Sequence, residues 1–264
     1  MSERHDSPAA VGVHLQQRAA LIGTGRPSVV ALVGADASLL DIRRADGDAE
    51  VLAAVPTCTR VCVDAPLVVA NEEGARDVER LLAWLDIPMF PSSRRRLAAL
   101  HGGLRGEDLR EGLATRAGDV VEAVPDATLR QIMLESGRTD ASTMGLAEYR
   151  REWLGLRAPR YRPKGEGRAR PSGALAAAAI VARVVDLGGW APRANADDWE
   201  AIDDAAVLDA VICAYTALRA EDPARALRLG APERGEILLA ADRAMRMRAA
   251  VNLARLRSEG LTGI

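Results

Sequence analysis

Short apolar runs rich in β-branched residues crowd the first part of the chain, and this pattern constrains the fold most strongly. The runs cover residues 11–15, 19–23, 28–33 and 38–42 and are separated by glycine, proline and charged residues. Strands spaced this closely usually pair with their neighbours in sequence. The pattern therefore predicts an antiparallel meander at the start of the chain.

Strands and helices alternate after this meander. Segment 48–54 reads as a short helix that leads into a strand at 60–63, and a second good strand follows at 119–124. Apolar residues recur at helical spacing between and after these two strands. The remaining predicted elements are helices at 73–86, 93–100, 107–116, 126–135, 146–154, 175–185, 205–218 and 243–256 and a short strand at 236–239.

This order of elements predicts one mixed α/β sheet, with the meander followed by parallel strands and with helices on the faces of the sheet. We expect residues 1–264 to form a single domain. A helical insertion is predicted at 128–200 and a helical C-terminal tail at 241–264.

Composition narrows the classes of function. With a formal net charge of -2, the protein has no overall positive potential that would attract nucleic acid. A content of 3% aromatic residues argues against a surface on which nucleic-acid bases stack. The three cysteines lack metal-ligand spacing, which is typical of a reduced cytosolic protein. The N-terminus lacks a signal-peptide pattern, and no apolar run reaches the roughly 18 residues of a membrane span. These features predict a cytoplasmic protein with no membrane partner.

Polar residues stand where three of the predicted strands end. They are His14 after Val-Gly-Val, Asp64 after Val-Cys-Val and Glu122 in the strand before Pro125. If these strands are parallel neighbours, the three side chains converge on one edge of the sheet. Asp209 lies in an otherwise apolar helix, where a buried carboxylate needs a metal or a cation as partner.

Clustered carboxylates repel each other, and a divalent cation removes that penalty. Mg²⁺ and Mn²⁺ prefer such oxygen ligands, and two ions about 4 Å apart can drive phosphodiester hydrolysis. We therefore expect Asp64, Glu122 and Asp209 to hold Mg²⁺ or Mn²⁺, with His14 as a further catalytic residue. Asp36, in a turn of the predicted meander, is an alternative to His14.

Two basic residues are candidate phosphate contacts. Arg76 could bind a substrate phosphate, or it could form an ion pair with an acid of its own helix. Lys164 lies in the basic loop 157–170, which reads either as a solvated loop or as a nucleic-acid clamp.

Several short motifs occur in an order that resembles a known family, the domain-of-unknown-function family 429 of predicted RNase-H-like nucleases. The resemblance spans roughly residues 9–240. The motifs are Val11-Gly12-Val13, Val63-Asp64-Ala65-Pro66-Leu67, Gly74-Ala75-Arg76-Asp77 with Arg80-Leu81-Leu82, Phe90-Pro91, Glu122 with Pro125, Leu208-Asp209-Ala210 with Ala214, and the segment 229–237.

This resemblance implies an RNase-H-like fold with central acidic residues and a metal-dependent nuclease activity. The family usually has aspartate where this chain has His14. That departure keeps a second hypothesis open, a catalytically degraded binding or regulatory protein of the same fold. A third hypothesis, relation to sugar kinases and actin-like ATPases, lacks the expected duplicated domain. The predicted partners are nucleic acid or a small phosphoester, and the C-terminal helix is a candidate surface for homo-oligomer formation.

Overall fold

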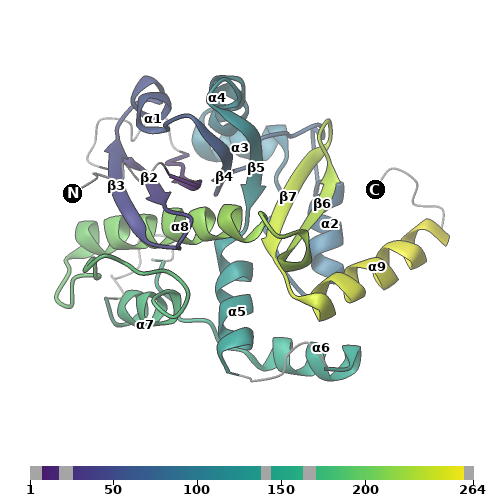
Figure 1. The fold of residues 1–264 in the computed structure, drawn as a ribbon. Coiled ribbons are helices and arrows are strands. Elements are labelled where there is room, and N and C mark those ends of the chain that lie inside the picture. Colours follow the sequence, from purple (N-terminus) through teal and green to yellow (C-terminus); the bar gives the residue numbers. More distant parts are fainter. Residues whose placement is uncertain (1–7, 18–25, 138–143, 163–170, 259–264) are drawn as a thin grey trace.

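The computed structural model describes residues 8–17, 26–137, 144–162 and 171–258. In this part of the chain, one seven-stranded mixed sheet is flanked by nine α-helices (Figure 1). The strands are β1 (Ala10–His14), β2 (Ser28–Val33), β3 (Leu39–Ala45), β4 (Cys58–Val63), β5 (Ala117–Ala123), β6 (Ala226–Ala231) and β7 (Gly235–Ala240). The helices are α1 (Asp48–Ala54), α2 (Asp77–Trp84), α3 (Arg94–His101), α4 (Arg105–Ala114), α5 (Pro125–Ser136), α6 (Leu146–Gly155), α7 (Pro171–Val181), α8 (Asp198–Arg219) and α9 (Arg243–Ser258).

The strand order across the sheet is β3-β2-β1-β4-β5-β7-β6. Strands β1, β2 and β3 form the predicted antiparallel meander, and β4, β5 and β7 run parallel to β1. The edge strand β6 pairs antiparallel with β7 and was not predicted. The predicted strand at 19–23 lies outside the described residues.

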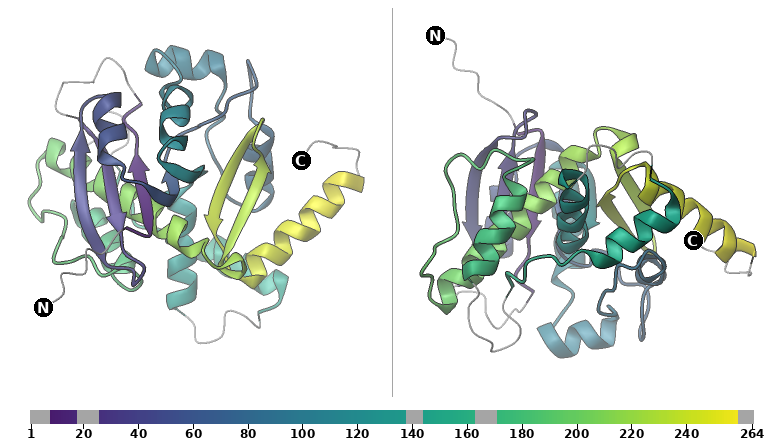
Figure 2. Two further views of the ribbon diagram at one scale, coloured as in Figure 1. Left: turned by 45° about the horizontal axis from the view of Figure 1, so that its top comes forward. Right: turned by 90° about the horizontal axis from the view of Figure 1, so that it is seen from below.

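Alternating side chains place a separate core on each face of the sheet. Val11 and Val13 of β1 pack with Leu109 and Leu113 of α4, in a core to which α1 also contributes. The other face is covered by α5, α7 and the long helix α8, which crosses the strands (Figure 2). The even-numbered residues of β1 therefore face α8, and this includes His14.

Two helices begin at capping residues that the sequence provides, although the start of the second lies well before its predicted position. The side chain of Ser93 accepts a hydrogen bond from the amide of Arg96 at the start of α3, and Gly102 ends this helix in the left-handed region. Helix α8 begins at Asp198, well before the predicted 205, because Asp197 caps it in a capping box with Glu200.

The helical region before α8 contains α6, α7 and most of α5, and it falls within the predicted insertion at 128–200. Helix α9 occupies the predicted C-terminal tail. Among the helices of the described residues, none combines the length and the apolar character that a membrane crossing requires.

Candidate metal centre

The C-terminal ends of β1 and β4 bring His14 and Asp64 side by side. Val13 is level with Val63 in the parallel pair, and the amide of Asp64 donates to the carbonyl of Val13 at 2.8 Å. The next residue on each strand therefore projects to the same face, the one that α8 covers. Nδ1 of His14 lies 3.3 Å from Oδ2 of Asp64.

Gly12 lets α8 approach β1 closely enough to add a third side chain. A Cβ at this position would lie only 1.9 Å from the carbonyl oxygen of Ala210 and 2.2 Å from the amide nitrogen of Ala214. Because the helix backbone lies directly against Gly12, Asp209 reaches the ends of the strands. Its Oδ2 lies 3.4 Å from Nδ1 of His14, and its side chain is only 1% exposed.

His14, Asp64 and Asp209 thus form a group that could hold a metal ion. One ligand atom from each residue lies within 4.8 Å of the other two. The group offers one imidazole nitrogen and two carboxylate oxygens. Asp64 and Asp209, two of the three predicted metal ligands, are brought together with His14.

Two residues from the basic loop complete the surroundings of Asp209. The hydroxyl of the buried Tyr161 donates to Oδ1 of Asp209 at 2.6 Å. Nε of Arg162 donates to Oδ2 of Asp209 at 2.7 Å, and Nη2 donates to Oδ1. Nη1 of Arg162 also donates to Oδ2 of Asp126 at 3.0 Å, while Nη2 lies 3.7 Å from Oδ2 of Asp64.

The sequence predicts that Asp209 needs a cationic partner, but it does not identify Arg162 as that partner. A lone carboxylate within the apolar helix α8 requires a cation or a metal. Arg162 is 47 residues away from Asp209 along the chain, so no local spacing connects them. Asp126 was also missed. It follows β5 in the first turn of α5, and its signal was its position just beyond a strand end.

Electrostatic coupling within this group shifts two pKa values strongly. Burial lowers the pKa of His14, but the hydrogen bonds to Asp209 and Asp64 outweigh it and raise that pKa from 6.5 to about 9. Burial would raise the pKa of Asp209, but Arg162 and His14 lower it to about 2. At neutral pH, a charged imidazole and a guanidinium therefore face the ionised carboxylate of Asp209.

Glu122 is not brought to this group, which corrects its expected placement. It is level with Val63 in the β4–β5 pair, so its side chain projects to the sheet face opposite α8. The residue level with Asp64 on β5 is instead Ala123. Oε1 of Glu122 accepts hydrogen bonds from the amide of Leu67 at 2.8 Å and from Arg76 at 2.6 Å.

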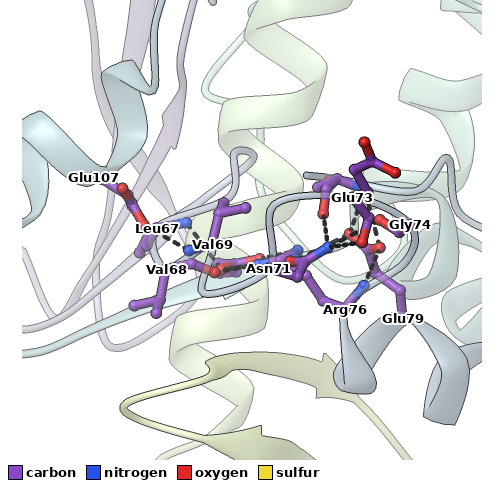
Figure 3. A network of polar contacts seen from close by, with 11 residues as sticks. Leu67, Val68, Val69, Asn71, Glu73, Gly74, Arg76, Glu79 and Glu107 are labelled. Carbon is purple, nitrogen blue, oxygen red and sulfur yellow. Dashed lines mark hydrogen bonds and ion pairs between the residues drawn. The ribbon is translucent and has the colours of Figure 1, made fainter. Parts of the chain in front are cut away.

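Arg76 is likewise placed away from the group. Its side chain is 1% exposed, and its guanidinium contacts Glu122 and Glu79. It also donates to the carbonyl of Val68 in the loop that links β4 to α2 (Figure 3). With these contacts made, Arg76 has no exposed surface to offer a substrate phosphate.

The last two sequence candidates do not contribute to the group. Asp36 lies in the turn between β2 and β3, where it accepts hydrogen bonds from the amide and hydroxyl of Ser38. Lys164 lies outside the described residues.

No family model, no curated protein and no solved structure matches the chain. The resemblance to the family of predicted RNase-H-like nucleases therefore stays a prediction. The evidence for function lies in the group of side chains itself.

Proposed function

We propose that this protein is a metal-dependent hydrolase of phosphodiester bonds, a nuclease or phosphodiesterase of RNase-H-like type. One observation carries the proposal. Donor atoms of His14, Asp64 and Asp209 lie within 4.8 Å of one another at the ends of two parallel strands. The ends of parallel strands are where open α/β sheets bind their ligands.

The donor set suits a divalent cation of intermediate hardness. Carboxylate oxygens are preferred by Mg²⁺ and Mn²⁺, while an imidazole nitrogen is more common around transition metals. One nitrogen with two oxygens therefore favours Mn²⁺ over Mg²⁺. A bound divalent cation would supply an activated water and charge neutralisation at the phosphate.

The chain's own residues have distinct roles in this proposal. His14, Asp64 and Asp209 would hold the ion, and His14 would release its ring proton on binding, because a metal binds a neutral imidazole nitrogen. The hydroxyl of Tyr161 holds Asp209 in place through its hydrogen bond to Oδ1. The substrate would be nucleic acid or a small phosphoester, because both present the oxygens that such an ion binds.

The arrangement of strands supports the RNase-H-like part of the proposal. The antiparallel meander β1–β3 is followed by β4 and β5, which lie next to β1 and run parallel to it. The resemblance also implies a mixed sheet, and this agreement supports the proposal. Strands β7 and β6 extend the sheet beyond this pattern.

Hydrolysis of bis(p-nitrophenyl) phosphate and of single-stranded RNA and DNA, with Mn²⁺ or with EDTA, tests the proposal. We expect Mn²⁺-dependent turnover that Asp64→Asn and Asp209→Asn each abolish. Asp36→Asn is the matched control, because it neutralises an aspartate of the β2–β3 turn outside the group. Turnover that persists in folded Asp64→Asn protein would refute the assignment.

A second candidate function is a binding or regulatory protein that keeps this fold without catalysis. The observation that favours it is the internal neutralisation of the acids. Arg162 and His14 balance Asp64 and Asp209 with no metal required. Calorimetric titration with Mn²⁺ and Mg²⁺ distinguishes the two functions. A hydrolase should show heat of metal binding that Asp64→Asn abolishes. A binding or regulatory protein should show no such heat.

A further inference from the structure

The guanidinium of Arg162 binds both carboxylate oxygens of Asp209, one of the two acids of the candidate metal centre. Oδ2 of Asp209 accepts from Nε of Arg162 at 2.7 Å, and the same oxygen faces Nδ1 of His14 at 3.4 Å. Oδ2 of Asp64 lies 3.3 Å from that nitrogen and 3.7 Å from Nη2 of Arg162. A cation that binds Asp209 therefore competes with Arg162 for its oxygens.

Arg162 is also more exposed to solvent than the buried acid that it binds. Its side chain is 35% exposed, whereas Asp209 is 1% exposed. Asp126, which holds the third nitrogen of the guanidinium, is 59% exposed. Arg162 is therefore accessible to a ligand in solvent, and the contact with Asp126 ties the guanidinium to the rim of the site.

We propose that Arg162 is the phosphate-binding residue of this site and that a bound metal ion releases it from Asp209. This inference rests on the proposed function. In the metal-free protein, the guanidinium takes the place of the ion on the carboxylates. With the ion bound, Asp126 keeps the guanidinium at the rim, where it meets the phosphate of the substrate.

The chemistry of arginine suits both positions. The planar fork of the guanidinium binds a carboxylate with two parallel hydrogen bonds, and it matches two oxygens of a phosphate equally well. Once a divalent cation neutralises Asp64 and Asp209, repulsion between like charges opposes the return of Arg162 to the same oxygens. The substrate phosphate then becomes its strongest available acceptor.

Calorimetric titration with Mn²⁺ tests the competition. Arg162→Gln removes the competing charge, so we expect the Kd for Mn²⁺ to fall by about tenfold or more, the scale of a hydrogen bond to a charged group. Arg160→Gln is the matched control, because it removes the same charge from an exposed residue two positions away. The Kd of this control should equal that of the unmodified protein.

Titration of the Mn²⁺-loaded proteins with inorganic phosphate tests the second role. We expect Arg162→Gln to weaken phosphate binding by about tenfold or more, and Arg160→Gln to leave it unchanged. Arg162→Lys keeps the charge and so protects the fold, but an ammonium cannot span both oxygens of Asp209. It should bind Mn²⁺ more tightly than the unmodified protein, by a smaller factor than Arg162→Gln.

The outcomes separate the two levels of the proposal. Suppose that the unmodified protein binds Mn²⁺ through Asp64, but that folded Arg162→Gln protein has unchanged affinity for Mn²⁺ or for phosphate. The role of Arg162 is then refuted, and the metal centre stands. The same holds if Arg162→Lys matches the unmodified protein for Mn²⁺. If no variant binds Mn²⁺, the metal centre and the role of Arg162 are refuted together.

Discussion

The guanidinium of Arg76 and the carboxylate of Glu122 form a buried two-point ion pair, with nitrogen–oxygen distances of 2.6 and 2.8 Å. Burial raises the pKa of Glu122, although Arg76 and the amide of Leu67 act in the opposite direction. The pair therefore joins the loop after β4 to β5 at a considerable desolvation cost. It is a structural element close to the candidate metal centre but on the other face of the sheet.

Breaking this pair from one side should be strongly destabilising. We expect Arg76→Met to lower the free energy of unfolding by about 3–5 kcal/mol, because it leaves Glu122 buried without a cation. Arg80→Met is the control, because its side chain is exposed on α2, the helix that Arg76 precedes, and it should change stability by about 0.5 kcal/mol or less. Urea denaturation measures both.

The double variant Arg76→Met with Glu122→Met should recover part of the lost stability. A double variant as unstable as Arg76→Met alone would contradict this account.

The close approach of β1 and α8 depends on Gly12. We expect Gly12→Ala to cost about 1–3 kcal/mol or more, because its Cβ would overlap the backbone of Ala210 and Ala214. Gly103→Ala, in the connection between α3 and α4, has open space around the new methyl group and should be neutral. Thermal unfolding compares the two variants. Equal melting temperatures for both would show that the helix does not lie against the strand as described.

The protonation of His14 should make the metal-free protein less stable in alkaline solution. Its folded-state pKa of about 9 lies above the ordinary 6.5, so the stabilisation is complete below pH 6.5 and is lost as the pH rises through 9. A shift of this size corresponds to about 3 kcal/mol.

Urea denaturation between pH 6.5 and about 9, with EDTA present, measures this loss. His14→Gln is the matched control, and its stability should be nearly flat over the same range. An equal slope in both proteins would show that another group is responsible.

Much of the fold could be predicted from the sequence because its signals are local. Helix α1 and strand β2 have the predicted bounds, since charged or Gly and Pro residues flank both. Strand β6 was missed because its pairing with β7 at the sheet edge, rather than a strongly apolar run, defines it. The early start of α8 was missed because its N-terminal turns are polar, although Asp197 and Glu200 provide a capping box.

The candidate site could be predicted only in part. The positions of His14, Asp64 and Asp209 follow from strand ends and from a lone acid in an apolar helix. The expected role of Glu122 depended on which face of β5 it occupies, and a shift of one residue in register reverses that face. The contact between Arg162 and Asp209 comes from tertiary packing across 47 residues, which no spacing in the sequence encodes.

Anomalous diffraction from crystals soaked in Mn²⁺ tests the central claim most directly. The account predicts a manganese peak coordinated by Nδ1 of His14 and by one carboxylate oxygen each from Asp64 and Asp209, with the guanidinium of Arg162 displaced from Asp209. A site without manganese under saturating Mn²⁺, with Arg162 still bound to Asp209, would contradict it.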